Sequence, residues 1–319
     1  MFKIRLVPAK TDVPFLRWRL AGFAFSGLLV IASLVLFFVN GLNKGIDFEG
    51  GILIEVALPG PADLGAMRAS LGGLGLGEVA LQEFGEPEDV LIRVERQPGD
   101  AEAQAAAVTA VKEALERDIG AGISYRRVEF VGPKVSAELI EAGREAVLLA
   151  VVAMLLYIWF RFEWQFSVGA VVALIHDVIL TIGMFSVTGI EFNLSSVAAI
   201  LTIVGYSVND TVVVYDRVRE NLRKYKALDL SALINLSIND TLARTTMTSL
   251  TTLLALFALF FVGGGVIQGF AAAMIWGVVV GTYSSIFIAA PLLLNLRLER
   301  RRPGGGAREE RAARAGGGD

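Results

Sequence analysis

Apolar residues in this chain are gathered into long runs, which are separated by short polar links and by one large polar insertion. The first run covers residues 20–39, and five more follow at 146–160, 168–187, 194–215, 247–262 and 270–296. A helix needs about 20 apolar residues to cross the hydrocarbon core of a bilayer. The pattern therefore predicts six transmembrane helices, and the runs at 146–160 and 247–262 must borrow flanking residues to reach full length.

The insertion between the first and second runs, residues 40–144, has a different pattern. Alternation typical of strands occurs at 46–58, 78–84, 89–95 and 123–131, and helical patterns occur at 61–71 and 100–118. The order strand, helix, strand, strand, helix, strand is that of the ferredoxin-like fold. About 90 residues suffice for a small independent core. We therefore expect an α+β ferredoxin-like domain between transmembrane helices 1 and 2.

Positive residues indicate the orientation, because loops on the cytoplasmic side are enriched in Lys and Arg. They occur before the first run, after the second, fourth and sixth runs, and not in the links near Gly189 and Gly263. This predicts a cytoplasmic N-terminus (1–19), transmembrane helix 1 (20–39), a periplasmic domain (40–144), transmembrane helices 2–6 (145–298) and a disordered cytoplasmic tail (299–319). A cleaved signal peptide fits less well, because the first run is long and no A-x-A site closes it.

Composition narrows the class of protein further. Of the 319 residues, 54% are hydrophobic, which indicates a membrane protein, and the net charge of −3 gives no reason to expect a nucleic-acid partner. The absence of cysteine and the single histidine exclude disulfides, a cysteine nucleophile and a His-rich metal site. No G-x-x-x-x-G-K-[ST] motif occurs, so we expect neither ATP as the energy source nor any cofactor.

The run at 194–215 carries Asp210 inside otherwise apolar sequence. A charged side chain at the bilayer centre costs roughly 2.5–3.5 kcal/mol on insertion scales, so it needs a partner or a use. Arg244 opens the fifth run, and an antiparallel hairpin would bring it level with Asp210. Burial disfavours the charged carboxylate and a guanidinium favours it, so we expect this pair to bind and release protons. A static buried ion pair is the alternative.

Three further polar residues are candidate accessories to this site. Asn209 precedes Asp210, Asp177 lies midway along the third run beside His176, and Thr248 belongs to a stripe of hydroxyl residues that follows Arg244. Hydroxyls inside a membrane can satisfy carboxylates or line a wet path. The alternative for Asp177 is that it caps or orients a neighbouring helix together with His176.

Five motifs, in order along the chain, resemble those of the SecF family, the smaller half of the SecDF membrane complex. They are GIDFEGG (45–51), RFEWQFSVGAVVALIHDV (161–178), IVGYSVNDTVVVYDRVREN (203–221), ARTTMTSLTTLLALFALFFVGG (243–264) and GTYSSIFIAAPLL (281–293). The resemblance covers about residues 15–298. It implies the fold of half an RND-type transporter, with six transmembrane helices and one ferredoxin-like periplasmic domain.

The resemblance also implies a function and partners. A protein of this family would pair with SecD in the bacterial inner membrane, with both termini cytoplasmic and lipid around it. The pair would use the proton-motive force to help SecYEG move an unfolded preprotein outward. Asp210 would conduct protons and Arg244 would be the functional cation, the same two residues that the cost of burial singles out.

The first motif implies a different role for its own residues. Asp47, Glu49, Gly50 and Gly51 match the family pattern directly after the first helix. A proton role does not follow for them, and we expect them to form a conformational joint between that helix and the external domain.

Three other functions compete with protein export. A proton-coupled exporter of small molecules or lipids would belong to the same superfamily and would need a large apolar cavity in the external domain. An intramembrane aspartyl protease could use Asp177 and Asp210, because paired carboxylates can share a proton and activate water. A structural scaffold would need neither carboxylate, and full export activity of an Asp210→Asn variant would favour it.

Overall fold

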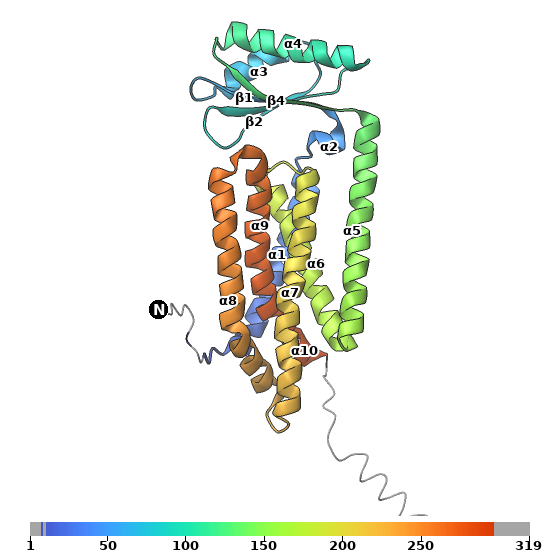
Figure 1. Ribbon diagram of the computed structural model, residues 1–319, viewed down its shortest axis with the longest axis vertical. Coiled ribbons are helices and arrows are strands. Elements are labelled where there is room, and N and C mark those ends of the chain that lie inside the picture. The colour runs from blue at the N-terminus through green and yellow to red at the C-terminus, as the bar shows by residue number, and fades with distance from the viewer. Residues whose placement is uncertain (1–7, 9–10, 297–319) are drawn as a thin grey trace, which may run out of the picture.

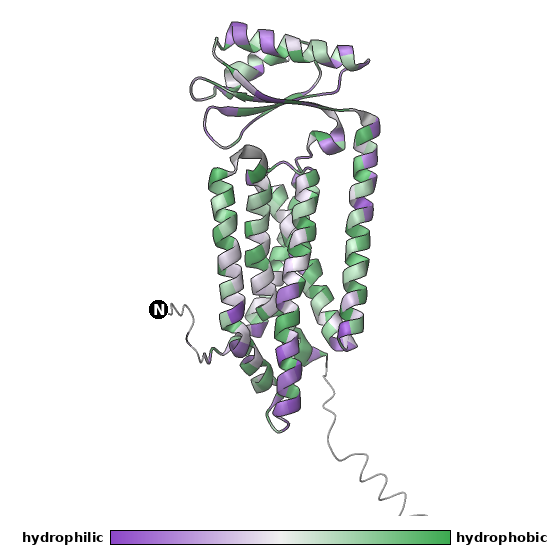
Figure 2. Cartoon of the chain, viewed as in Figure 1, coloured by the Kyte–Doolittle hydropathy of each residue, from purple (hydrophilic) through white to green (hydrophobic). Residues whose placement is uncertain are grey.

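The computed structural model describes residue 8 and residues 11–296. A bundle of long helices makes up most of the molecule, and a small sheet covered by two helices lies at one end of it (Figure 1). Apolar residues dominate the bundle, whereas polar residues concentrate in the small domain and at the end of α7 that is farthest from this domain (Figure 2). The predicted tail at 299–319 and most of the first ten residues lie outside the described part of the chain.

The bundle is built from helices on both sides of the small domain in the sequence. They are α1 (Arg19–Asn40), which follows the 3-10 turn η1 (Phe15–Trp18), and α5 (Pro133–Arg161), α6 (Trp164–Thr188), α7 (Leu194–Lys224), α8 (Leu230–Val262) and α9 (Gly264–Ser284). A π-helical segment, η2 (Ser285–Ala289), continues α9 into α10 (Ala290–Asn295).

Among the described residues, five helices are long and apolar enough to cross a membrane: Phe15–Asn40, Trp164–Thr188, Leu194–Lys224, Leu230–Val262 and Ile267–Asn295. They correspond to five of the six predicted spans. The remaining predicted span, at 146–160, corresponds to α5. This helix runs beside the bundle (Figure 1) but is not among the five. Its apolar stretch at 146–160 is only about 22 Å long at 1.5 Å per residue, short of a core of about 30 Å.

Helix ends in the bundle follow local side-chain chemistry. Asn193 and Ser196 form a reciprocal capping box at the start of α7, and Asp229 accepts from the backbone at the start of α8. Such caps satisfy amide groups that have no partner inside the helix. Gly189 has a φ of +66° and ends α6 in the left-handed conformation, which glycine adopts at little cost. Sequence chemistry thus sets the short turn between α6 and α7.

The small domain contains a four-stranded antiparallel sheet in the order β2-β3-β1-β4. Its elements, in chain order, are β1 (Gly51–Ala57), α3 (Leu64–Gly72), β2 (Val79–Glu83), β3 (Asp89–Val94), α4 (Ala101–Asp118) and β4 (Ser124–Val131). Helices α3 and α4 lie on the face away from the bundle (Figure 1). Their apolar stripes and the inward residues of β1 and β3 form one core, whose members Ile54, Met67, Ile92 and Val111 are fully buried.

One local prediction in this domain is wrong. Residues 46–49, which we expected at the start of a strand, form a single helical turn, α2 (Ile46–Glu49), and the strand begins only at Gly51. Gly50 has a φ of +73° and ends this turn. The turn also carries Asp47 toward the start of α7, where its carboxylate accepts a hydrogen bond. Tertiary contact has overridden the alternating pattern of this stretch.

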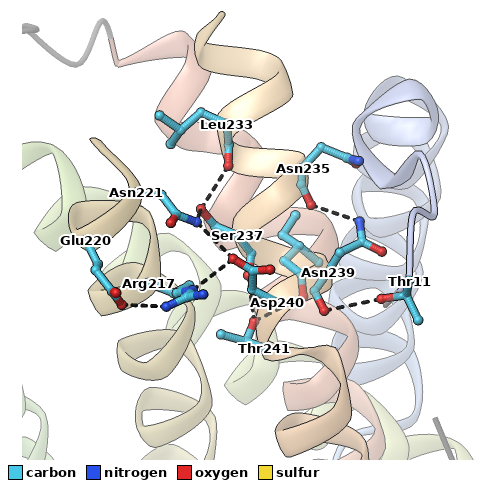
Figure 3. A network of polar contacts seen from close by, with 11 residues as sticks. Thr11, Arg217, Glu220, Asn221, Leu233, Asn235, Ser237, Asn239, Asp240 and Thr241 are labelled. Atoms are coloured by element: carbon cyan, nitrogen blue, oxygen red, sulfur yellow. Dashed lines mark hydrogen bonds and ion pairs between the residues drawn. The ribbon is translucent and has the colours of Figure 1, made fainter. Parts of the chain in front are cut away.

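A polar network fixes the end of the bundle farthest from the sheet. Asn239 of α8 donates to the carbonyl oxygen of Val13 at 3.0 Å, while its own carbonyl accepts from Thr11 at 3.3 Å. On the other side of α8, Asp240 accepts from Arg217 and from Asn221 of α7 (Figure 3). The segment before α1 and the α7–α8 hairpin are therefore held together.

Candidate functional site

Asp210 lies inside the bundle, with 5% of its surface exposed. It is on the face of α7 that packs against α9, and its Oδ2 accepts a hydrogen bond of 2.5 Å from the Ser285 hydroxyl. Hydrogen bonds to a charged group contribute roughly twice as much as those between neutral groups. The predicted interior position of this carboxylate is confirmed, and a serine is its hydrogen-bond partner.

Asp177 is even more deeply buried, with 1% of its surface exposed. Its Oδ2 accepts from Ser207 of α7 at 2.5 Å and from Ser284 of α9 at 2.7 Å. Its Oδ1 lies 2.8 Å from Nδ1 of His176. One carboxylate on α6 therefore connects three helices. This arrangement fits the alternative in which Asp177 orients a neighbouring helix together with His176.

The two carboxylates are connected through neighbouring positions of the chain. Ser284 ends α9 and binds Asp177, while Ser285 opens the π-helical segment η2 and binds Asp210. Single π-helical turns inside α-helices are frequent at functional sites. The two carboxylates are therefore bound by consecutive residues at one irregular turn.

Tyr215 secures the far end of the π-helical segment. Its ring is fully buried, and its hydroxyl donates to the carbonyl of Ala289 at 3.0 Å. Gly169 of α6 leaves room for this hydroxyl, because a Cβ at that position would collide with it. The irregular winding of η2 is thus supported from both α6 and α7.

Small residues bring α9 close to α7 at the level of the cluster. A Cβ on Gly277 would overlap the side chain of Ile203, and one on Gly281 would lie 3.2 Å from the Cβ of Ser207. Small residues let membrane helices approach closely and pack tightly. This close approach brings Ser284 and Ser285 to the carboxylates.

Thr211 follows Asp210 along α7, and Thr245 faces Asp210 from α8. Thr211 and Thr245 are 1% and 2% exposed, and neither hydroxyl has a hydrogen-bond partner among the described residues. Thr245 of α8 is close enough to influence the Asp210 carboxylate. Buried hydroxyls without partners are costly, so the Thr245 hydroxyl is available to the carboxylate or to a proton carrier.

Arg244 does not form the expected ion pair with Asp210. No carboxylate lies within 4.0 Å of its guanidinium in the described part of the chain, and its side chain is exposed. Its charge is nevertheless near enough to attract that of Asp210. The physical reason is helical phase: successive residues are rotated by about 100°, so Thr245 faces Asp210 and Arg244 lies to the side.

The two other accessory candidates lie away from the carboxylates. Asn209 is exposed on the outer face of α7. The Thr248 hydroxyl donates to the backbone carbonyls of Arg244 and Thr245 at 3.1 and 2.9 Å. Such bonds satisfy the hydroxyl within its own helix.

His176 extends the cluster toward α1. Its ring packs against Tyr283 with centroids 6.3 Å apart, and the Tyr283 hydroxyl binds Ser26 and the carbonyl of Gly22. Its Nε2 is buried without a hydrogen-bond partner in the described chain. The imidazole therefore has one nitrogen engaged by Asp177 and one free.

The motif at 45–51 forms a contact between the domain and the bundle. The Asp47 carboxylate accepts from the amide of Leu194 at 2.8 Å, at the start of α7. Gly51 has a φ of +117°, and a Cβ there would lie 2.6 Å from the carbonyl oxygen of Val94. Glu49 lies 3.6 Å from Lys44 in an exposed ion pair, which contributes little.

Arg93 of β3 reinforces the same contact. One of its nitrogens donates to the Asn43 side chain at 3.1 Å and to the Lys44 carbonyl at 2.7 Å. Another lies 3.5 Å from Glu191 in the loop between α6 and α7. Burial raises the pKa of Glu191 above its usual value, against the attraction of Arg93.

Sequence reasoning missed the serines. Ser284 and Ser285 were part of the quoted run at 281–293, and Ser207 lies three residues before Asp210. A pair of adjacent serines inside an apolar span was the available signal. No group of three or more His, Asp or Glu residues that could hold a metal ion occurs among the described residues.

Comparisons with known proteins agree with this architecture. A family model described as "Protein export membrane protein SecD/SecF, C-terminal" matches residues 111–299. A second, described as "SecD/SecF GG Motif", matches residues 35–58 and includes the joint.

Similar proteins cover nearly the whole chain. Protein translocase subunit SecF of Rickettsia felis is 47% identical over 293 residues, and that of Rickettsia rickettsii 48%, each alignment spanning 92% of this chain and 94% of the relative. The crystal structure of SecDF from Thermus thermophilus, a translocon-associated membrane protein, matches 92% of this chain with a TM-score of 0.82 and 35% identity. This chain spans 40% of that longer one.

Proposed function

The chain belongs to the SecD/SecF family of protein-export membrane proteins, and on that premise we propose that it is the SecF half of a proton-driven SecD–SecF pair. The relatives are protein translocase subunits, which favours protein export over export of small molecules or lipids. The relatives are named as SecF subunits, and SecD is the partner that we propose for the chain. The pair would use the proton-motive force to help SecYEG translocate unfolded preproteins.

Asp210 is the proton carrier in this proposal. The observation that supports it is a carboxylate buried in a membrane helix and held by one hydroxyl of a π-helical turn. Losing or gaining the Ser285 bond changes how well the charged form is stabilised. Movement of η2 would therefore switch Asp210 between a form that holds a proton and one that releases it.

Arg244 sets when Asp210 is charged. Its guanidinium stays protonated, so it acts as a counter-charge and not as a proton carrier. A small rotation of α8 would bring it from its exposed position toward Asp210, and this would favour release of the proton. Asn209 and Thr248 would act only in such a rearranged state.

We also propose an architecture for the pair. We assign α5 as the sixth transmembrane helix, shortened at its polar end, and the small domain as ferredoxin-like, because its sheet order is β2-β3-β1-β4 with both helices on one face. The bundle would then be one half of an RND-type transporter, and SecD would supply the other half.

Topology supports an orientation in the bacterial inner membrane. The start of α1, the turn between α7 and α8, and the end of α10 all lie at the end of the bundle opposite the sheet (Figure 1). Their flanking Lys and Arg residues favour a cytoplasmic location for this end. The sheet domain would then be periplasmic and could meet the emerging preprotein, with 45–51 as its conformational joint.

A proteolytic role for the two aspartates has less support. Each carboxylate is bound by serines of its own, and no hydrogen bond joins the two among the described residues. The relatives are named as transport components.

An export assay tests the proposal. Inverted membrane vesicles that contain this chain with its SecD partner would translocate a model preprotein with and without a proton-motive force. Asp210→Asn is expected to lower the rate to that measured without the force, whereas Glu163→Gln, an exposed carboxylate at the start of α6, keeps the full rate. Equal rates for Asp210→Asn and the unmodified chain would contradict a proton-carrying role for Asp210 and would favour the structural scaffold.

A further inference from the structure

A cationic pocket lies at the end of the bundle opposite the sheet, apart from the buried carboxylates. It has a volume of about 550 Å³ and opens between the α5–α6 turn and the end of α7. Its lining consists of Arg161, Asp216, Arg219, Glu220, Arg223 and Lys224. The polar end of α7 stands out against the apolar bundle (Figure 2).

One side of the pocket is rigidly organised. Arg161 donates to both oxygens of Asp216 at 2.9 Å, and Arg219 lies 3.7 Å from the same carboxylate. Both guanidinium groups also lie against the ring of Phe162, at 5.0 and 5.3 Å from its centroid. Phe162 is buried beneath them, so the two arginines are held in place before any ligand arrives.

The other side carries positive charge that the protein does not neutralise. Arg223 and Lys224 are exposed, and neither has a carboxylate at ion-pair distance in the part of the chain that is described. The second carboxylate of the pocket, Glu220, is already bound by Arg217 at 2.6 Å. The pocket is therefore suited to an anion.

Neighbouring aromatic residues indicate which anion. Trp159, Phe160 and Trp164, on both sides of the α5–α6 turn, are 70%, 87% and 57% exposed. Tryptophan is enriched where the membrane meets water. Exposed aromatic rings beside a cationic pocket offer a surface for acyl chains next to a site for phosphate.

We propose that this pocket binds the phosphate of an anionic phospholipid headgroup, with Arg219, Arg223 and Lys224 as its ligands and the exposed aromatic rings beside its acyl chains. Basic pockets between membrane helices on the cytoplasmic side are suited to such headgroups. The bound lipid would tie the α5–α6 turn to the end of α7. This inference is independent of proton transport by Asp210.

Native mass spectrometry of the purified protein with added phosphatidylglycerol or phosphatidylcholine tests the proposal. An Arg223→Gln/Lys224→Gln double variant is expected to bind phosphatidylglycerol about 25-fold more weakly, at about fivefold for each basic side chain. A matched Arg17→Gln/Arg19→Gln variant removes two charges near the start of α1, at the same end of the bundle, and is expected to bind normally.

A variant that is expected to bind more tightly provides a test that misfolding cannot mimic. Glu220→Gln removes one negative charge from the pocket and is expected to bind phosphatidylglycerol more tightly than the unmodified chain. Equal losses in the two double variants would overturn the proposal in favour of diffuse surface charge. Equal binding of the two lipids, or complete displacement by inorganic phosphate at millimolar concentration, would also overturn it.

Discussion

The residue at the centre of the site, Asp210, owes its properties to the hydroxyls around it. Ser285 binds it directly, and Ser284 binds Asp177 in the same way. Each bond joins a buried carboxyl group to a neutral donor, and Asp177 has additional partners in Ser207 and His176. The chemistry of the cluster therefore depends on two adjacent side chains as much as on the carboxylates.

Replacement of Ser284 tests this dependence. Ser284→Ala is expected to lower the free energy of unfolding by about 1.5–3 kcal/mol, the range for a hydrogen bond to a charged group. Ser167→Ala is a matched control, because Ser167 is also buried in the bundle but makes only 3.4 Å contacts to carbonyls. Thermal unfolding in detergent measures both. Equal shifts in Tm would contradict a special role for Ser284.

Glu191 gives a pH-dependent prediction at the joint. Its pKa is raised by burial, with Asp47 adding to the effect and Arg93 and Arg127 opposing it. An acid whose pKa is raised in the folded state holds its proton more tightly there than in the unfolded state. Its contribution to stability is complete below the ordinary pKa of glutamate and is lost as the pH rises through the raised value.

Hydrogen exchange at the Leu194 amide measures this effect, because that amide donates to Asp47 at the joint. Its protection factor is expected to fall as the pH rises through the raised pKa of Glu191. Glu191→Gln should remove the fall, whereas Glu129→Gln, which changes an exposed carboxylate on β4, should keep it. A fall that persists in Glu191→Gln would show that another group titrates.

At the scale of elements, the approach of α9 to α7 positions the serines. Gly277→Ala would push a methyl group into Ile203, and overpacking of this kind costs about 1–3 kcal/mol. A Cβ added at Gly205 of α7 would have no neighbour within 4 Å among the described residues, so Gly205→Ala is expected to be neutral or stabilising by up to about 1 kcal/mol. Thermal unfolding of the two variants compares them directly, and equal stability would show that α9 can move away without cost.

The difference between prediction and structure is largest where helices meet. Periodicity alone placed β2, β3, α4 and β4 within about one residue of their observed bounds, because these patterns are local. It did not predict α2, whose helical turn follows from contact with the start of α7, or the π-helical winding of η2. The partners of Asp210 could not be predicted, because the phase of one helix against another is set by packing such as that at Gly277.

Arg244 illustrates the same limit. The position of Arg244 along the bundle was predictable from the α7–α8 hairpin. The direction in which its side chain points from α8 was not. A rotation of about 100° separates it from Thr245, and this rotation decides whether an ion pair forms. The position of the candidate residues along the helices was therefore easier to predict from the sequence than the direction in which their side chains point.

At the scale of the whole molecule, the bundle and the small domain are in contact through residues 45–51. The Asp47 carboxylate caps α7, the helix that carries Asp210. If a change in the hydrogen bonds of Asp210 moves α7, we expect the small domain to be affected through this direct contact. The proposed lipid site lies at the other end of the same helix, where a lipid headgroup would restrain it.

Proton flux into proteoliposomes that contain this chain with its SecD partner is the most direct test of the account. An imposed potential and a pH-sensitive dye in the lumen would report the initial rate. Asp210→Asn is expected to abolish the protein-dependent flux, Arg244→Ala to reduce it strongly, and Glu163→Gln to leave it unchanged. Flux that remains at the unmodified rate in both Asp210→Asn and Arg244→Ala would contradict the proposal that Asp210 carries the proton.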